Sequence, residues 1–273
     1  WIIGASWHPA SQLAEKRYLT RHELDAAAPN NPVHLQTVGH IAMFNSAALK
    51  IAGIDRNTPD PVGGVIEKDS AGEPTGVMFA RAMNLVSKHV PPPSVDELET
   101  SYLQAMKYAN SQGITSLADP GLAPNQVAAL QRLMIAGKMT VRYNAMYALP
   151  DSLSEQQYDI ATRIPGISSG FGNDWLKMDA IGEMSIDGGM TLRTAFTRDP
   201  YPHDHDYHGI PSTPVEKLNS MVSIGNRNGW RFAIHCVGDA ACDRVLDAYE
   251  KANAEKSIVD RRFAIVHGSL LRR

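Results

Sequence analysis

The pattern of apolar and polar positions changes at a proline-rich break, Pro91-Pro92-Pro93. Downstream of it, apolar stripes at helical spacing alternate with short apolar runs, as expected when helices and strands take turns along a chain. Upstream of it, the signals are shorter and mixed. The pattern therefore predicts two segments, residues 1–93 and residues 94–273.

The upstream segment, residues 1–93, predicts a mixed α+β structure. Gly53 follows a helical run and is typical of the position just after a helix end. Two apolar runs flank a turn-rich stretch and indicate a hairpin with a longer loop. The predicted elements are a strand at 33–38, a helix at 45–52 and a hairpin formed by 64–68 and 76–79.

The downstream segment, residues 94–273, predicts a regular βα alternation. Ser94 and Glu97 have the spacing of a capping box, and Thr213 and Asp239 are the predicted N-caps of two later helices. Repeated βα alternation predicts a parallel sheet that is either doubly wound or closed into a barrel. No GxGxxG or GxxxxGK[ST] motif follows a strand, which argues against nucleotide binding. The predicted strands are 114–118, 141–147, 180–186, 232–235 and 263–267.

Composition and charge narrow the class of protein. The chain is 43% apolar and 20% charged, so it can bury a substantial core. The near-balance of 26 Lys plus Arg against 29 Asp plus Glu argues against a nucleic-acid partner. No apolar run approaches the roughly 20 residues that span a bilayer, so no membrane partner is predicted.

The cysteines and the ends of the sequence give information about the cellular compartment of the protein. Cys236 and Cys242 imply no disulfide framework, and Cys236 is interpreted as a small buried apolar side chain. This cysteine content favours a reducing compartment such as the cytoplasm. The chain begins at Trp1 without Met and stops at Arg273 after an apolar run, so we expect an internal piece of a longer protein. A periplasmic or secreted location stays open, because a signal peptide would precede Trp1.

Two histidines end apolar runs at a spacing of about 30 residues, the size of one βαβ unit. Adjacent parallel strands would then present His235 and His267 at the same edge. In a (β/α)8 barrel the active site lies at the C-terminal edge, and imidazole is the commonest metal ligand. Alternatively, each histidine caps a buried strand and bonds a carbonyl. The matching positions favour a metal site.

Glu183 is the third candidate ligand. Strand alternation places Glu183 and Asp187 on one face together with Ile181 and Ser185, while the other face is apolar. The acidic face would point into the barrel, where a metal or a cation would offset the cost of burying a carboxylate. The alternative is a salt bridge to Arg231.

A second histidine pattern lies at 202–208, where His203 and His205 form an HxH. Prolines precede it and no apolar strand leads into it, so a metal site there would lack rigid support. We interpret this stretch as a lid or a substrate-contacting loop, with His208 as a candidate substrate contact.

The ordered set of motifs resembles the amidohydrolase superfamily, specifically amidohydrolase family 3, which includes N-substituted formamide deformylase-like enzymes. The resemblance covers nearly the whole chain. It rests on Val38-Gly39-His40, Asn45-Ser46-Ala47-Ala48-Leu49, Ala52-Gly53-Ile54, Gly113-Ile114-Thr115-Ser116 with Asp119, Ile186-Asp187-Gly188-Gly189, Ile234-His235-Cys236-Val237-Gly238-Asp239 and Ile265-Val266-His267.

The resemblance implies a TIM-like barrel that holds one or two divalent metals, usually zinc. The family pattern has an HxH on strand 1, a carboxylated Lys or a Glu on strand 4, His on strands 5 and 6, and Asp on strand 8. His235 and His267 match the strand 5 and strand 6 ligands, and Glu183 falls where many relatives carry the Lys, which leaves the metal count open. The five strands would be strands 2 to 6, with residues 1–93 inserted after strand 1. Strand 1 and strand 8 are absent from this sequence.

The implied function is hydrolysis of a C–N bond in an amide or N-acyl compound by a metal-activated water. The partner is then a small-molecule substrate, with His40 and Asp187 lining its pocket. The absent strand 8 Asp would be the general acid/base, so the 273-residue chain is expected to be inactive alone. The alternative is a non-catalytic amidohydrolase-like protein with a regulatory or binding role, as in exoenzyme regulation.

Overall fold

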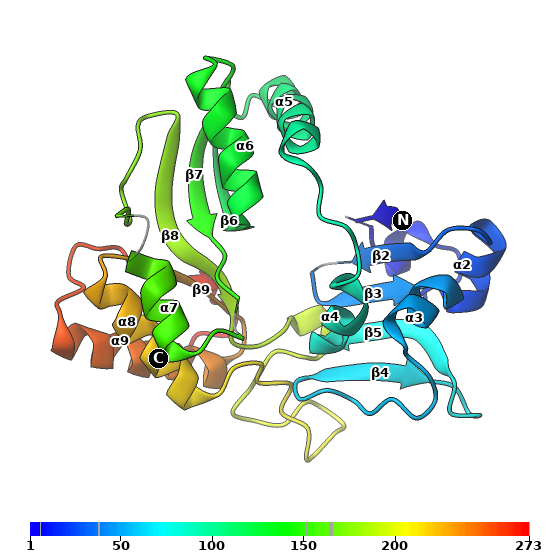
Figure 1. Cartoon of the computed structure of the whole chain (residues 1–273). Helices are drawn as coiled ribbons and strands as arrows, with labels where there is room; N and C mark the ends of the chain where they lie inside the picture. The colour runs from blue at the N-terminus through cyan, green and yellow to red at the C-terminus, as the bar shows by residue number, and fades with distance from the viewer. Residues whose placement is uncertain (6, 38, 151, 164–165, 273) are drawn as a thin grey trace. The chain divides into compact units, whose positions relative to one another are not determined.

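The computed structural model describes residues 1–5, 7–37, 39–150, 152–163 and 166–272. Val38, the last residue of a predicted strand, and Arg273 lie outside them. The chain forms two compact units, Trp1–Pro92 and Pro93–Arg273, which meet within the proline-rich break. Figure 1 shows the elements of both units.

The first unit is built on a five-stranded sheet with the order β1-β2-β3-β5-β4. β1 pairs with β2 in parallel and the other pairs are antiparallel, so β4 and β5 form the predicted hairpin. The elements are β1 (Ile2–Gly4), α1 (Pro9–Gln12), α2 (Arg21–Ala27), β2 (Val33–Thr37), β3 (Ile41–Phe44), α3 (Ser46–Ala52), β4 (Gly64–Lys68), β5 (Pro74–Ala80), the 3-10 turn η1 (Arg81–Met83) and α4 (Asn84–Ser87).

Asn45 fixes the start of α3 in the first unit. Its buried side-chain oxygen accepts hydrogen bonds from the Ala48 amide at 3.1 Å and from the Val33 amide at 2.9 Å. The same side chain therefore caps the helix and holds the first residue of β2. Gly53 ends α3 with φ +68, a left-handed conformation that glycine adopts without steric cost. This helix confirms the prediction for 45–52.

The second unit contains a curled, all-parallel sheet with the order β6-β7-β8-β9-β10, which has the form of a half-barrel (Figure 1). Consecutive strands are neighbours, as the βα alternation predicts. The elements are α5 (Val95–Ser111), β6 (Ser116–Leu122), α6 (Pro124–Ile135), β7 (Arg142–Tyr147), α7 (Glu155–Arg163), β8 (Leu176–Ser185), the 3-10 turn η2 (Met190–Leu192), α8 (Val215–Arg227), β9 (Phe232–Cys236), α9 (Asp239–Glu255) and β10 (Ala264–His267).

The core of the second unit lies between this sheet and its helices. The apolar stripe of α5 packs there through Leu98, Tyr102 and Met106. The predicted capping box is present, since the Glu97 carboxylate accepts the Ser94 amide at 2.8 Å and the Ser94 hydroxyl accepts the Glu97 amide. Local sequence and tertiary packing thus agree on where this helix begins and which face it buries.

The starts of two helices differ from the prediction. α8 begins at Val215 with Pro214 at the N-cap, because the Thr213 hydroxyl donates to the Ser185 carbonyl at 3.1 Å instead of capping the helix. α9 begins at Asp239 itself with Gly238 as its N-cap. In both places a side chain expected to cap its own helix makes a tertiary contact instead: Thr213 bonds the last residue of β8, and the Asp239 carboxylate accepts the Arg198 amide of the following loop at 2.9 Å.

Strand bounds also shift. β8 begins at Leu176, before the predicted 180, and β6 runs over Ser116–Leu122 instead of 114–118. Pairing with neighbouring strands sets these limits, and a single chain segment does not contain that information. Within the described residues, no helix combines the length and the apolar character that crossing a bilayer requires.

Candidate metal centre

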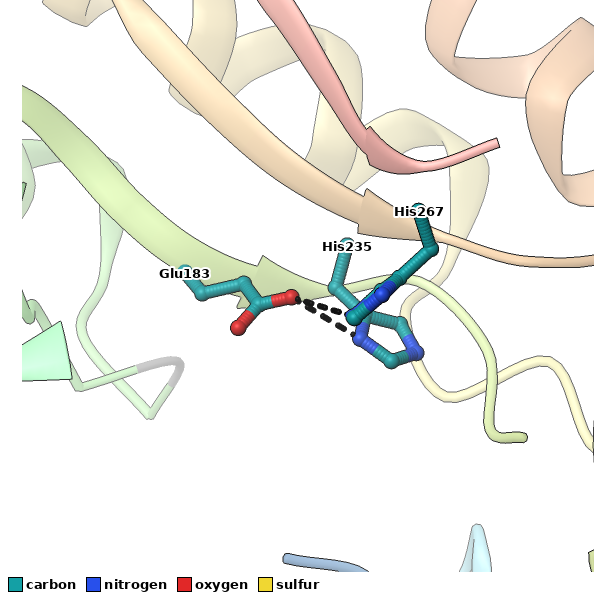
Figure 2. A group of neighbouring side chains, drawn as sticks. All are labelled: Glu183, His235 and His267. Carbon is teal, nitrogen blue, oxygen red and sulfur yellow. Dashed lines mark hydrogen bonds and ion pairs between the residues drawn. The ribbon is translucent and has the colours of Figure 1, made fainter. Parts of the chain in front are cut away.

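Three consecutive strands bring Glu183, His235 and His267 together at the C-terminal edge of the curled sheet (Figure 2). Glu183 lies near the end of β8, His235 near the end of β9, and His267 is the last residue of β10. Because β8, β9 and β10 are parallel neighbours, their ends meet at one edge.

The donor atoms of this cluster are close enough to share one ion. The Glu183 Oε1 atom lies 3.0 Å from His235 Nδ1 and 3.0 Å from His267 Nε2. All three donors lie within 4.8 Å of one another. Zinc bonds of about 2.0–2.2 Å in tetrahedral geometry place ligand atoms roughly 3.3 Å apart. Small side-chain rotations would therefore bring this set of one carboxylate and two imidazoles into zinc-binding geometry.

The hydrogen bonds of His235 give a further reason to expect a cation. Its Nε2 atom lies 3.2 Å from the Gly188 carbonyl oxygen, which can only accept, so Nε2 carries a proton. Its Nδ1 atom lies 3.0 Å from Oε1 of Glu183, a contact that needs either a proton on Nδ1 or a metal ion between the two atoms. The residues present therefore fit a divalent metal.

Burial and charge act together at the cluster. The His235 side chain is 7% exposed and the Glu183 side chain 23% exposed. The hydrogen bond from His235 is the main cause of the lowered pKa of Glu183, which keeps this side chain a carboxylate. Burial lowers the pKa of His235, but its hydrogen bonds to Glu183 and Gly188 and the nearby negative charge outweigh burial and raise the pKa overall. The site thus favours positive charge, which a bound metal ion would supply.

His267 reaches the cluster through an unusual backbone conformation. The register of β10 on β9 pairs Val266, and not His267, with His235. Regular alternation would therefore direct the His267 side chain to the opposite face. His267 has φ +73, a left-handed conformation that is uncommon outside glycine and concentrates at functional sites. The turned imidazole lies with its centroid 4.6 Å from that of His235.

A break in strand register brings Glu183 to the same face as His235. The pairing of β8 with β9 shifts between Ile181 and Met184. Ile181 is buried in the core on the helix side of the sheet, whereas Glu183 meets His235. The sequence prediction put Ile181 and Glu183 on the same face of the strand. This was wrong, because the register shift between them turns the two side chains to opposite faces.

Gly182 permits this shift, since a Cβ atom at this position would lie 2.5 Å from the Ala233 carbonyl oxygen of β9. We expect Gly182→Ala to lower the free energy of unfolding by about 2–3 kcal/mol, because the backbone of β9 would have to move. Urea unfolding followed by circular dichroism measures the change. Met178→Leu, a volume-conserving change on the same strand, is the control. An unchanged midpoint for Gly182→Ala would contradict the close approach of the two strands.

Asp187 lies next to the cluster but makes contacts of another kind. Its carboxylate is 1% exposed and accepts the backbone amides of Val237 at 3.0 Å, Gly238 at 2.7 Å and Phe196 at 2.9 Å. It lies 3.7 Å from His235 Nε2. Burial raises the pKa of Asp187, and the three amides act against that rise. The carboxylate thus joins the loop after β8 to the loop after β9, a bond pattern that sequence reasoning missed.

The remaining histidines of the predicted site belong to other segments of the chain. His40 belongs to the first unit, at the turn between β2 and β3. The His208 ring lies 3.1 Å from the Thr197 carbonyl within the loop between β8 and α8. The HxH of His203 and His205 is not part of any group of three or more metal-binding side chains found among the described residues.

Arg231, the alternative partner weighed for Glu183, pairs with another carboxylate. It forms a two-point ion pair with Asp179 of β8, with N–O distances of 3.0 and 2.6 Å. Both side chains are largely buried, at 18% and 24% exposure. This ion pair satisfies the buried arginine without Glu183, whose carboxylate pairs with His235 and His267.

Comparisons with a family model and with curated proteins point to the same family. The model of the amidohydrolase family matches residues 1–273. YtcJ of Bacillus subtilis (strain 168), whose name places it among amidohydrolases, is 33% identical over 99% of this chain and 50% of its own length. The N-substituted formamide deformylase of Arthrobacter pascens is 28% identical over 94% of this chain and 47% of its own length. The chain spans about half the length of these curated relatives.

A solved structure shares the fold. The crystal structure of an uncharacterized metal-dependent hydrolase from Pyrococcus horikoshii OT3 matches with a TM-score of 0.65 and 22% sequence identity. The match covers 92% of this chain and 48% of that one. At this level of identity the match shows a common architecture, in which the curled parallel sheet carries the three candidate ligands.

Proposed function

The chain belongs to the amidohydrolase family, and on that premise we propose that the protein is a metal-dependent hydrolase. The observation that carries the proposal is the group of Glu183, His235 and His267 at the ends of three parallel strands, whose donor atoms all lie within 4.8 Å of one another. The proposed bond is a C–N bond of an amide or N-acyl compound. The name of the relative from Arthrobacter pascens, an N-substituted formamide deformylase, supports this choice.

We propose zinc as the ion, with Glu183, His235 and His267 as its protein ligands. Two imidazoles and a carboxylate suit zinc, although related divalent ions bind similar sets. When bound, such an ion polarises a carbonyl group and lowers the pKa of water to about 7. The protein's own task is orientation: the Gly188 carbonyl accepts the His235 Nε2–H group, which would direct Nδ1 at a bound ion.

Other parts of the proposal concern the whole protein. We propose that β6 to β10 correspond to strands 2 to 6 of a (β/α)8 barrel and that the first unit is inserted after strand 1. Activity then requires groups from the remaining strands, so we expect the 273-residue chain to bind metal without hydrolysing amides. The substrate contacts predicted for His40, Asp187 and His208 stay predictions. Since the Asp187 carboxylate is taken up by backbone amides, we propose that it positions the site.

The test of this function uses metal removal from the full-length protein. Prolonged dialysis against a chelator is expected to lower the rate of hydrolysis of a panel of N-acyl and N-formyl compounds at least about ten-fold. The reason is that the ion would stabilise the negative charge that develops on the carbonyl oxygen in the transition state. Stoichiometric Zn²⁺ should restore the activity. A His22→Ala variant is the control, since His22 is an exposed residue of α2 outside the metal-binding group, and it should behave as the parent.

Two results would contradict the proposal. Hydrolysis that continues unchanged after verified metal removal would show that the cluster is not the catalytic centre. A protein that binds metal through the cluster but hydrolyses none of the panel, including ester and cyclic amide substrates, would argue for the alternative binding or regulatory role.

A further inference from the structure

The two cysteines of the chain lie against each other. Cys236 is the last residue of β9 and Cys242 lies in the first turns of α9. Their sulfur atoms are 2.6 Å apart, and the residues are 0% and 3% exposed. Both are free thiols in this structure. Since the chain contains only these two cysteines, their contact is a specific pairing and not the by-product of a cysteine-rich sequence.

The segment between the cysteines supports the candidate metal centre. Cys236 directly follows His235, and the next two residues donate the amides of Val237 and Gly238 to the Asp187 carboxylate. A covalent link from Cys236 to Cys242 would therefore close a loop around the residues that hold Asp187. The fixed end of β9 and the start of α9 already place the sulfur atoms side by side.

We propose that Cys236 and Cys242 form a reversible disulfide when the protein meets an oxidising thiol–disulfide couple. The observed separation exceeds a disulfide bond length by only about 0.6 Å, so little backbone movement is needed. This modification is independent of the proposed hydrolytic function.

The reaction with glutathione disulfide balances as two exchanges. A cysteine thiolate attacks one sulfur of glutathione disulfide, which forms a mixed disulfide and releases one glutathione thiolate. The second cysteine thiolate attacks the protein sulfur of that mixed disulfide, forms the Cys236–Cys242 bond and releases the second glutathione thiolate. The two released thiolates take up the two protons that the cysteines lost. Because both cysteines are buried, the first attack requires a local opening, and the reaction is best measured at equilibrium.

Mass spectrometry provides the first test. The folded 273-residue chain is incubated in glutathione buffers of increasing oxidised fraction until the pattern is constant, then denatured and alkylated. We expect two alkylated cysteines under reducing conditions and none under oxidising conditions, with a mass lower by two hydrogens and a peptide that links Cys236 to Cys242. Two cysteines that remain alkylatable throughout, or carry only glutathione, would overturn the proposal.

Thermal unfolding provides the second test. Closing the short loop restricts the unfolded chain, so the oxidised protein is expected to unfold about 5 °C higher than the reduced protein. The difference should vanish in a Cys236→Ala/Cys242→Ala double variant, whose two states differ in nothing else. Hydrogen exchange of the Val237 and Gly238 amides should also slow on oxidation. Equal midpoints and equal exchange in a chain shown by mass to be oxidised would contradict the placement of the bond in the folded structure.

Discussion

Replacing His235 by alanine is expected to weaken Zn²⁺ binding to the chain by at least about 100-fold. His235 is the most buried of the three ligands and is held on both sides, by Gly188 through Nε2 and by Glu183 next to Nδ1. Its loss removes one of three protein donors and leaves the Glu183 carboxylate without its main partner. Competition against a fluorescent zinc chelator measures the affinity.

The control for this variant is His208→Ala, because His208 belongs to the loop between β8 and α8 and bonds the Thr197 carbonyl. It should bind Zn²⁺ as the parent does. A comparison with Glu183→Gln separates charge from shape, since the amide keeps an oxygen donor but removes the negative charge. If His235→Ala retained parental affinity while remaining folded, the metal would have to bind elsewhere, and the assignment of the cluster would be wrong.

Much of the fold follows from local pattern. The capping box at Ser94, the left-handed Gly53 and the βα alternation are set by nearby residues, and the structure has each of them. His235 and His267 were recognisable because each ends an apolar run, and the ends of parallel strands lie at one edge. The sequence thereby indicated the three candidate ligands before their geometry was known.

The positions of the Glu183 and His267 side chains depend on the pairing register of neighbouring strands and on backbone conformation, and the local sequence pattern contains neither. Glu183 reaches His235 only through the register shift that Gly182 allows, and His267 only through its left-handed backbone. Strict alternation would have placed Ile181 beside Glu183 and turned His267 away. The sequence argument for Glu183 therefore rested on a strict alternation that the register of β8 does not follow.

Asp187 illustrates the same limit. Strand alternation placed it on the same face as Glu183, and only the family resemblance implied that it lines the substrate pocket. Only tertiary structure shows that its two carboxylate oxygens accept three amides from two different loops. The glycines that follow it and Gly238 offered the one local signal, because close backbone approach to a buried carboxylate favours small residues.

Replacing Asp187 by alanine is expected to lower the free energy of unfolding by about 4 kcal/mol. The change leaves the amides of Val237, Gly238 and Phe196 without acceptors, and each buried unpaired donor costs about 1–3 kcal/mol. Urea unfolding measures the loss. Zinc affinity should fall as well, because the loop that carries Gly188 would no longer hold the His235 ring.

Asp199→Ala is the matched control for Asp187→Ala, since Asp199 lies in the same loop with a side chain that is 71% exposed and paired to Arg272. An exposed ion pair contributes little, so this variant should change stability by less than about 1 kcal/mol. The stability of Asp187→Asn should lie between those of Asp187→Ala and Asp199→Ala. The single amide oxygen of Asn can still accept hydrogen bonds from the loop amides, but its NH₂ group is a donor and faces another donor where the second carboxylate oxygen was. Equal stability of Asp187→Ala and Asp199→Ala would contradict a supporting role for the buried carboxylate. If Asp187→Ala instead kept parental stability and zinc affinity but impaired only hydrolysis in the full-length protein, the residue would contact substrate, as the family resemblance implies.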